Sequence, residues 1–233
     1  MSTTTNARKV TLDTYWFLMK TSLWFTFTVL LIYVALHIFL AHVDVLQQNF
    51  LSFAVEPAKI YMLVMGILSV FAFLTFFMRQ GVTRKDYFTG TALSAFFVSI
   101  TLMIVFSVLS FIHQLFAEVE PTSFIGDDAS WFALATAFTL NVFLYYIVGW
   151  LIGAGFYRYG WIGGCLYILI ALLLVITIDN LWEFELDGLL KTLTNVSMEE
   201  FPTYLSVIGS LLLCGISLWM IRASTKRIEI KVK

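Results

Sequence analysis

Long apolar segments alternate with short polar segments along the whole chain. Six of the apolar segments have the length of a transmembrane helix, because about 20 residues at roughly 1.5 Å each cross the hydrocarbon core of a bilayer. These predicted spans are residues 21–41, 58–78, 89–116, 131–152, 161–178 and 203–221. The pattern therefore predicts an all-α, polytopic membrane protein with a single transmembrane domain that covers residues 1–233.

Two further helical segments are predicted outside these spans. Apolar residues recur at helical spacing through residues 11–20 and into the first span, at Leu12, Tyr15, Trp16, Met19 and Leu23. This stripe suits a helix in the membrane interface, to which Tyr15, Trp16 and Met19 would belong, although a simple extension of the first span fits equally well. Residues 179–202 alternate apolar and acidic positions, which predicts one or two short amphipathic helices at the outer surface.

Charge is distributed unevenly between the two sides that this topology defines. Sixty per cent of the residues are apolar and only 12% are charged, which excludes an ordinary soluble domain. With both termini in the cytoplasm, twelve of the fourteen Lys and Arg residues fall on the inner side, and only Lys59 and Lys191 fall outside. Because inner loops of membrane proteins are rich in basic residues, this asymmetry predicts cytoplasmic termini.

Few residues in the predicted spans suggest chemistry. No span carries a basic or acidic residue near its middle, which argues against ion-coupled transport. His37 and His113 are the nearest candidates for a proton-carrying role, and Asn141 and Tyr145 are candidates for lining a substrate path. Hydrogen bonding between helices explains such residues equally well. Two glycine pairs, Gly149-x-x-x-Gly153 and Gly160-x-x-x-Gly164, predict close helix packing.

The chain lacks the sequence motifs of common catalytic sites. It contains no G-x-x-x-x-G-K-[ST], no G-x-S-x-G and no H-E-x-x-H. We therefore do not expect an enzyme, and we expect no cofactor or metal ion bound by this chain. A nucleic-acid partner is not expected either.

The most specific sequence is a short charged segment between the second and third spans. It reads Gly81, Val82, Thr83, Arg84, Lys85, Asp86, Tyr87 and Phe88. Gly81 permits a sharp exit from a helix, and Thr83 is suited to cap the next helix together with Asp86, three residues on. Tyr87 and Phe88 are predicted to offer apolar faces to a partner. A topology anchor with no further role is the alternative interpretation.

This segment resembles the loop G-[VI]-[ST]-R-x-x-[FY]-[FY] of small bacterial ABC transporter permeases of the export class. In that family the loop forms a coupling helix that docks on a separate ATPase subunit. The junction between the fourth and fifth spans, residues 149–160, resembles the corresponding junction of the same family. It includes Phe156, Tyr157, Arg158 and Tyr159.

The resemblance implies a permease subunit in a bacterial cell membrane. It would pair with a second permease subunit, identical or related, and with two ATPase chains that hold ATP and Mg²⁺. Its cargo would be hydrophobic or amphipathic, such as a peptide, an antibiotic or a lipid-like molecule, and membrane lipid would surround it. Two alternatives remain open: a membrane scaffold or sensor that binds a cytoplasmic partner without transport, and an ion-coupled secondary transporter.

Overall fold

The computed structural model describes residues 3–39, 49–116, 130–182 and 203–226, and every regular element within them is helical. The elements are α1 (Thr3–Phe39), α2 (Phe50–Leu68), the π-helix η2 (Ser69–Leu74), α3 (Thr75–Arg79), α4 (Arg84–Phe116), α5 (Trp131–Leu181) and α7 (Thr203–Thr225). Because α2, η2 and α3 follow one another without a break, the described residues form five helices long and apolar enough to cross a membrane. The predicted all-α membrane architecture is confirmed at this level.

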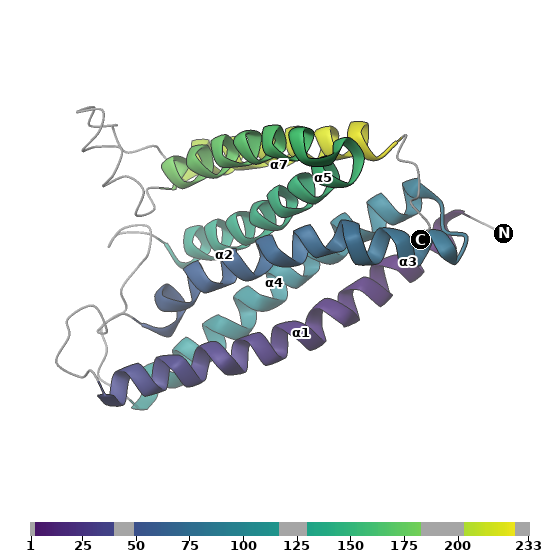
Figure 1. Ribbon diagram of the computed structural model, residues 1–233. Helices are drawn as coiled ribbons and strands as arrows, with labels where there is room; N and C mark the ends of the chain where they lie inside the picture. The colour runs from purple at the N-terminus through teal and green to yellow at the C-terminus, as the bar shows by residue number, and fades with distance from the viewer. Residues whose placement is uncertain (1–2, 40–48, 117–129, 183–202, 227–233) are drawn as a thin grey trace, which may run out of the picture.

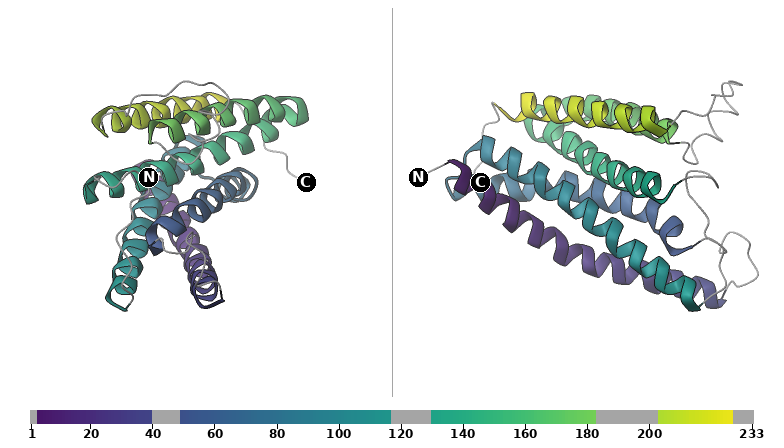
Figure 2. Two further views of the ribbon diagram at one scale, coloured as in Figure 1. Left: turned by 90° about the vertical axis from the view of Figure 1, so that its left-hand side faces the viewer. Right: turned by 180° about the vertical axis from the view of Figure 1, so that it is seen from behind.

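The helices form a bundle in which α1 and α4 lie side by side and run in the same direction, whereas α2 runs in the opposite direction to both (Figure 1). α1 packs along α4 on one side, α5 packs along α7 on the other, and α2 joins the two pairs through its contact with α5 (Figure 2). The start of α1, the turn between α3 and α4, and the end of α7 lie at the same end of the bundle.

Helix α5 reverses direction at Gly160. This residue has φ 70° and ψ −155°, a left-handed conformation that glycine adopts without a Cβ penalty. The Tyr145 hydroxyl donates a hydrogen bond to Asp179 at 3.0 Å, whereas 34 residues of straight helix would separate the two by about 51 Å. α5 is therefore a hairpin of two helical arms (Figure 1). The turn predicted over residues 153–160 is reduced to Gly160, because helix continues through Tyr159.

Helix α1 is one continuous element, so a separate interfacial helix before the first span is not found in the described residues. No Pro or Gly interrupts residues 3–39, and nothing in the sequence breaks the helix. The predicted apolar stripe faces outward at Leu12, Trp16 and Leu23, while the buried face carries Val10, Thr14, Leu18 and Ser22. Of the predicted interfacial residues, Met19 packs against the core and Tyr15 hydrogen-bonds through its hydroxyl to Thr101 at 3.1 Å.

The second membrane helix begins earlier than predicted. The Asn49 side chain accepts a hydrogen bond from the backbone N–H of Ser52 at 2.9 Å, and α2 starts at Phe50. Pro57, which directly precedes the predicted span, therefore lies inside the helix. Of residues 179–202, predicted to form short amphipathic helices between the fifth and sixth spans, the first three continue α5 to Leu181, and residues 183–202 lie outside the described residues.

Glycines bring the backbones of α2 and α5 into direct contact. A Cβ added to Gly149 would clash with the carbonyl oxygen of Leu63, and one added to Gly66 would clash with the carbonyl oxygen of Tyr146. A Cβ on Gly153 would lie 2.9 Å from the carbonyl oxygen of Ile67. The prediction of close packing at Gly149-x-x-x-Gly153 is confirmed. At the second pair, Gly160 forms the reversal and Gly164 packs against the ring of Phe156.

We expect Gly149→Ala to destabilise the protein by about 1–3 kcal/mol, because the added methyl group forces two helix backbones apart. Gly215→Ala on α7 is the matched control, since an added Cβ there has no neighbour within 4 Å. That control should be neutral or stabilising by up to about 1 kcal/mol. Thermal unfolding in mild detergent measures both, and equal effects would contradict the proposed contact.

Candidate functional site

The turn between α3 and α4 has the local geometry that its sequence predicts. Gly81 adopts φ +79°. The Thr83 hydroxyl accepts a hydrogen bond from the backbone N–H of Asp86 at 3.2 Å and donates one to the Asp86 carboxylate at 2.8 Å. Thr83 therefore caps α4, which begins at the next residue and continues without interruption to Phe116. No separate coupling helix lies between α3 and α4.

The two aromatic residues of this turn face the interior. Tyr87 is 1% exposed, and its hydroxyl donates a hydrogen bond to the carbonyl oxygen of Ser69 at 2.7 Å. Phe88 is half-buried, with its ring centroid 5.4 Å from that of Trp150. The prediction that Tyr87 offers an apolar face to a partner is wrong. Because α4 starts directly at Arg84, the helical period turns Tyr87 toward the core.

Two arginines from different turns meet at the end of α7. The Arg84 guanidinium donates a hydrogen bond to the carbonyl oxygen of Lys226 at 2.9 Å. The Arg158 guanidinium donates to the carbonyl oxygens of Ala223 at 3.0 Å and Ser224 at 2.6 Å. The last carbonyl groups of a helix lack intrahelical partners and carry partial negative charge, so both arginines stabilise this end. α7 thus joins the two segments that resemble permease loops.

The other residues of the second segment also pack within the chain. The Phe156 ring lies 5.9 Å from Trp161, Tyr157 lies 6.2 Å from Phe71, and Tyr159 lies 5.8 Å from Tyr167, all between ring centroids. In the first segment, Gly81, Thr83 and Lys85 are the exposed residues. Lys85 is therefore the charged side chain of this segment that is most accessible to another molecule.

A buried ionic cluster lies between α2 and the two arms of α5. The Lys59 ammonium is 2.6 Å from a carboxylate oxygen of Glu56 and 3.4 Å from one of Asp179. The second carboxylate oxygen of Asp179 accepts the hydrogen bond of Tyr145, and the Lys59 nitrogen lies 5.5 Å from the centre of the Tyr145 ring. The side chains of Lys59 and Asp179 are only 1% and 3% exposed. A cation buried to this degree needs such partners.

The sequence interpretation missed this cluster. It assigned Lys59 to the outer side and Asp179 to an outer connection, yet both lie inside helices that can cross a membrane. Lys59 follows the start of α2 by nine residues, a rise of about 14 Å. The available signal was Lys59 itself, one of only two basic residues on the predicted outer side. Its partner Asp179 is 120 residues away and could not be identified from spacing.

The remaining polar residues predicted in the spans have separate surroundings in the structure. His37 of α1 and His113 of α4 lie edge to face with their ring centres 5.5 Å apart, and Tyr33 contacts both rings. Asn141 is fully buried and donates a hydrogen bond to the carbonyl oxygen of Ala137 at 2.9 Å. Tyr145 belongs to the ionic cluster. The described residues contain no group of His, Cys, Asp or Glu with the geometry to hold a metal ion.

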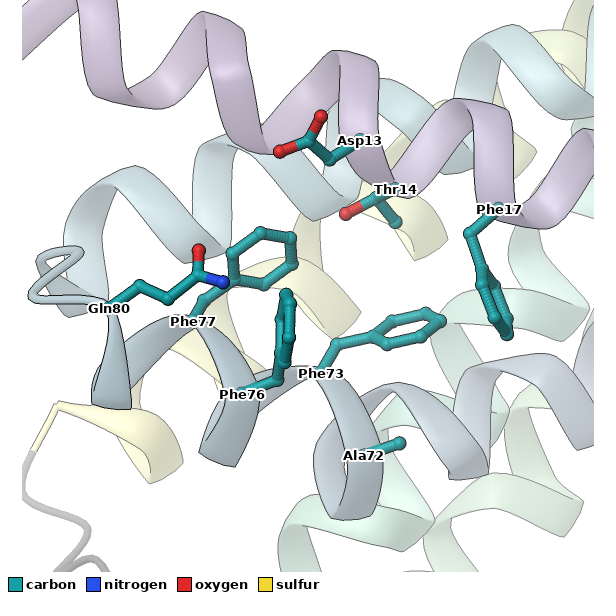
Figure 3. Close-up of a pocket in the computed structure, with 8 residues that line it drawn as sticks. All are labelled: Asp13, Thr14, Phe17, Ala72, Phe73, Phe76, Phe77 and Gln80. Carbon is teal, nitrogen blue, oxygen red and sulfur yellow. The ribbon is translucent and has the colours of Figure 1, made fainter.

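A cavity of about 450 Å³ lies between α1 and the η2–α3 segment (Figure 3). Its walls are largely aromatic, with Asp13, Thr14 and Gln80 as the polar exceptions. The lining residues are Asp13, Thr14, Phe17, Ala72, Phe73, Phe76, Phe77 and Gln80. A smaller cavity of about 170 Å³ shares Asp13, Phe77 and Gln80 and adds Asn6 and Lys9. Together they form a space in which a ligand of mixed polarity would fit.

No family model, curated protein or solved structure matches this chain. Its function must therefore be inferred from its own residues and their geometry.

We expect Lys59→Met to destabilise the protein by about 3–5 kcal/mol, because Asp179 would remain buried without its cation. The double variant Lys59→Met/Asp179→Leu should lose less unfolding free energy than Lys59→Met alone. Chemical or thermal unfolding in mild detergent provides the comparison. Lys85→Met, an exposed lysine, serves as the control and should stay within about 0.5 kcal/mol of the parent. If the loss in the double variant equals the sum of the losses in Lys59→Met and Asp179→Leu, the two side chains do not interact.

Proposed function

We propose that this chain is the membrane-spanning permease subunit of an ATP-driven ABC exporter in a bacterial cell membrane. ATP and Mg²⁺ would bind to separate ATPase chains, and a second permease subunit would complete the membrane part. The observation that carries this proposal is the turn at residues 81–88, whose sequence resembles the family's ATPase-coupling loop and whose side chains contact three other parts of the bundle.

The helix arrangement supports a topology of six crossings for the proposed permease. Each arm of α5 would cross the membrane once, and α2, η2 and α3 would form a single crossing. The turn at residues 80–83, the reversal at Gly160 and the end of α7 then share one side. Arg79, Arg84, Lys85, Arg158 and Arg222 belong to these segments, which supports a cytoplasmic location for that side.

Contacts of the turn offer a route for mechanical coupling. Tyr87 links it to the π-helix of the second crossing, Phe88 to Trp150 of α5, and Arg84 to the end of α7. A displacement of the turn would therefore act on three crossings at once. Energy from ATP hydrolysis on a partner would reach the membrane helices through these packed contacts.

We expect Lys85→Glu to weaken association with the ATPase about tenfold, because it reverses the most exposed charge of residues 81–88. Arg8→Glu is the matched control, an exposed charge reversal at the start of α1. Arg84 and Tyr87 are less suitable, since both have structural partners within the chain.

The measurement is purification of the tagged protein from native membranes, with the bound chains identified and quantified by mass spectrometry. A stoichiometric partner with a P-loop, reduced by Lys85→Glu and retained by Arg8→Glu, supports the exporter. Recovery of a cytoplasmic partner without a P-loop would instead support the scaffold or sensor.

An ion-coupled secondary transporter is the second candidate function, and the buried Lys59–Asp179 pair favours it. In that case the purified chain alone should carry protons across liposomes under an imposed potential, and Asp179→Asn should abolish the flux. Arg8→Gln, which removes an exposed charge outside the cluster, is the control. Absence of flux from the parent protein would reject this candidate.

A further inference from the structure

One face of α1 changes from polar to aromatic along the two adjoining cavities. Asn6, Lys9 and Asp13 follow one another at helical spacing on this face, and Phe17 comes one turn later. Neither Lys9 nor Asp13 forms an ion pair with another described residue. The groove formed by the two cavities therefore has a polar end with charges of both signs and an aromatic end.

A buried hydroxyl group points to a ligand in this groove. Thr14 is 2% exposed and lines the larger cavity, yet its hydroxyl oxygen has no hydrogen-bond partner among the described residues. Asp13 and Gln80 are exposed beside it (Figure 3). A buried hydroxyl group without a hydrogen-bond partner lowers the stability of the folded protein. A molecule that hydrogen-bonds to Thr14 would remove this penalty.

The other end of the groove is suited to an apolar chain. The rings of Phe17 and Phe73 meet at right angles with their centres 5.0 Å apart and close the cavity there. Phe77 is buried against the core, whereas Phe76 is 54% exposed. The polar end lies near the turn that follows α3, and the aromatic end lies deeper along the span. This is the order in which a lipid presents its head group and its chains.

We infer that the groove binds a phospholipid whose head group combines a primary ammonium group with a phosphate. The ammonium group would donate hydrogen bonds to the Asp13 carboxylate and the Thr14 hydroxyl, and the phosphate would pair with Lys9. Part of one acyl chain would lie against Phe73, Phe76 and Phe17. The larger cavity, about 450 Å³, is within the usual range of about 300–1,000 Å³ for ligand sites.

This inference goes beyond the proposed function, because lipid binding at the groove requires neither an ATPase nor transport. A primary ammonium group is preferred to a trimethylated one, since only the former has N–H groups for the oxygen acceptors of the three residues Asp13, Thr14 and Gln80. A lipid with an anionic head group lacks the cation that Asp13 would pair with.

The test is native mass spectrometry of the purified full chain with phosphatidylethanolamine, phosphatidylcholine and phosphatidylglycerol of identical acyl chains. We expect phosphatidylethanolamine to bind most tightly. Asp13→Asn should weaken its binding about tenfold and remove its advantage over phosphatidylcholine, because a charge-assisted hydrogen bond is lost. Glycerophosphoethanolamine, which lacks the chains, should not bind measurably.

Phe76→Ala should weaken binding of all three lipids severalfold by removing part of the apolar wall. Phe111→Ala on α4 is its matched control, since Phe111 is 63% exposed and lies outside the groove. Thermal unfolding of each variant establishes that it is folded. Equal binding of the three lipids, or unchanged binding in Asp13→Asn, would overturn the inference. Equal losses in Phe76→Ala and Phe111→Ala would overturn it too, because they would indicate a general lipid surface.

Discussion

The backbone contact between α2 and α5 is the constraint on which the rest of the bundle depends. Gly66 and Gly149 stand opposite carbonyl groups of the facing helix, so no side chain separates the two backbones. In a bilayer, where lipid is as apolar as the helices, such close approach is a main source of attraction between them. It also holds Lys59 beside Tyr145, and the reversal of α5 brings Asp179 to the same place. The ionic cluster therefore depends on two features built from glycine.

Local sequence patterns predicted most of the helices and the Thr83 cap. The apolar segments, the Thr83 cap and the Gly149-x-x-x-Gly153 contact all depend on residues close together in the sequence. The apolar stripe of α1 was interpreted less successfully, because a helix in a bilayer carries apolar residues on its lipid-facing side as well as on its packed side. Its core face is marked by Thr14 and Ser22, which a soluble protein would expose.

The candidate sites were predicted less completely because they combine distant residues. Tyr87 was assigned to a partner surface from its place in the charged segment, whereas its burial follows from α4 beginning three residues earlier. Arg84 and Arg158 carry the resemblance to a known family, yet sequence could not indicate that both contact α7. The groove likewise needs α1 and α3 in their folded positions, since Asp13 and Gln80 are 67 residues apart.

The π-helix at residues 69–74 changes which way side chains face on its two sides along the second crossing. A wide turn adds one residue to a helix, and each residue accounts for about 100° of rotation. Lys59 precedes this turn, whereas Phe76 and Phe77 follow it. The direction in which the cluster faces is thus set independently of the direction in which the aromatic wall faces. Deleting one residue from the wide turn would rotate the wall by about 100° relative to Lys59, so this segment sets the angle between the two ends of the crossing.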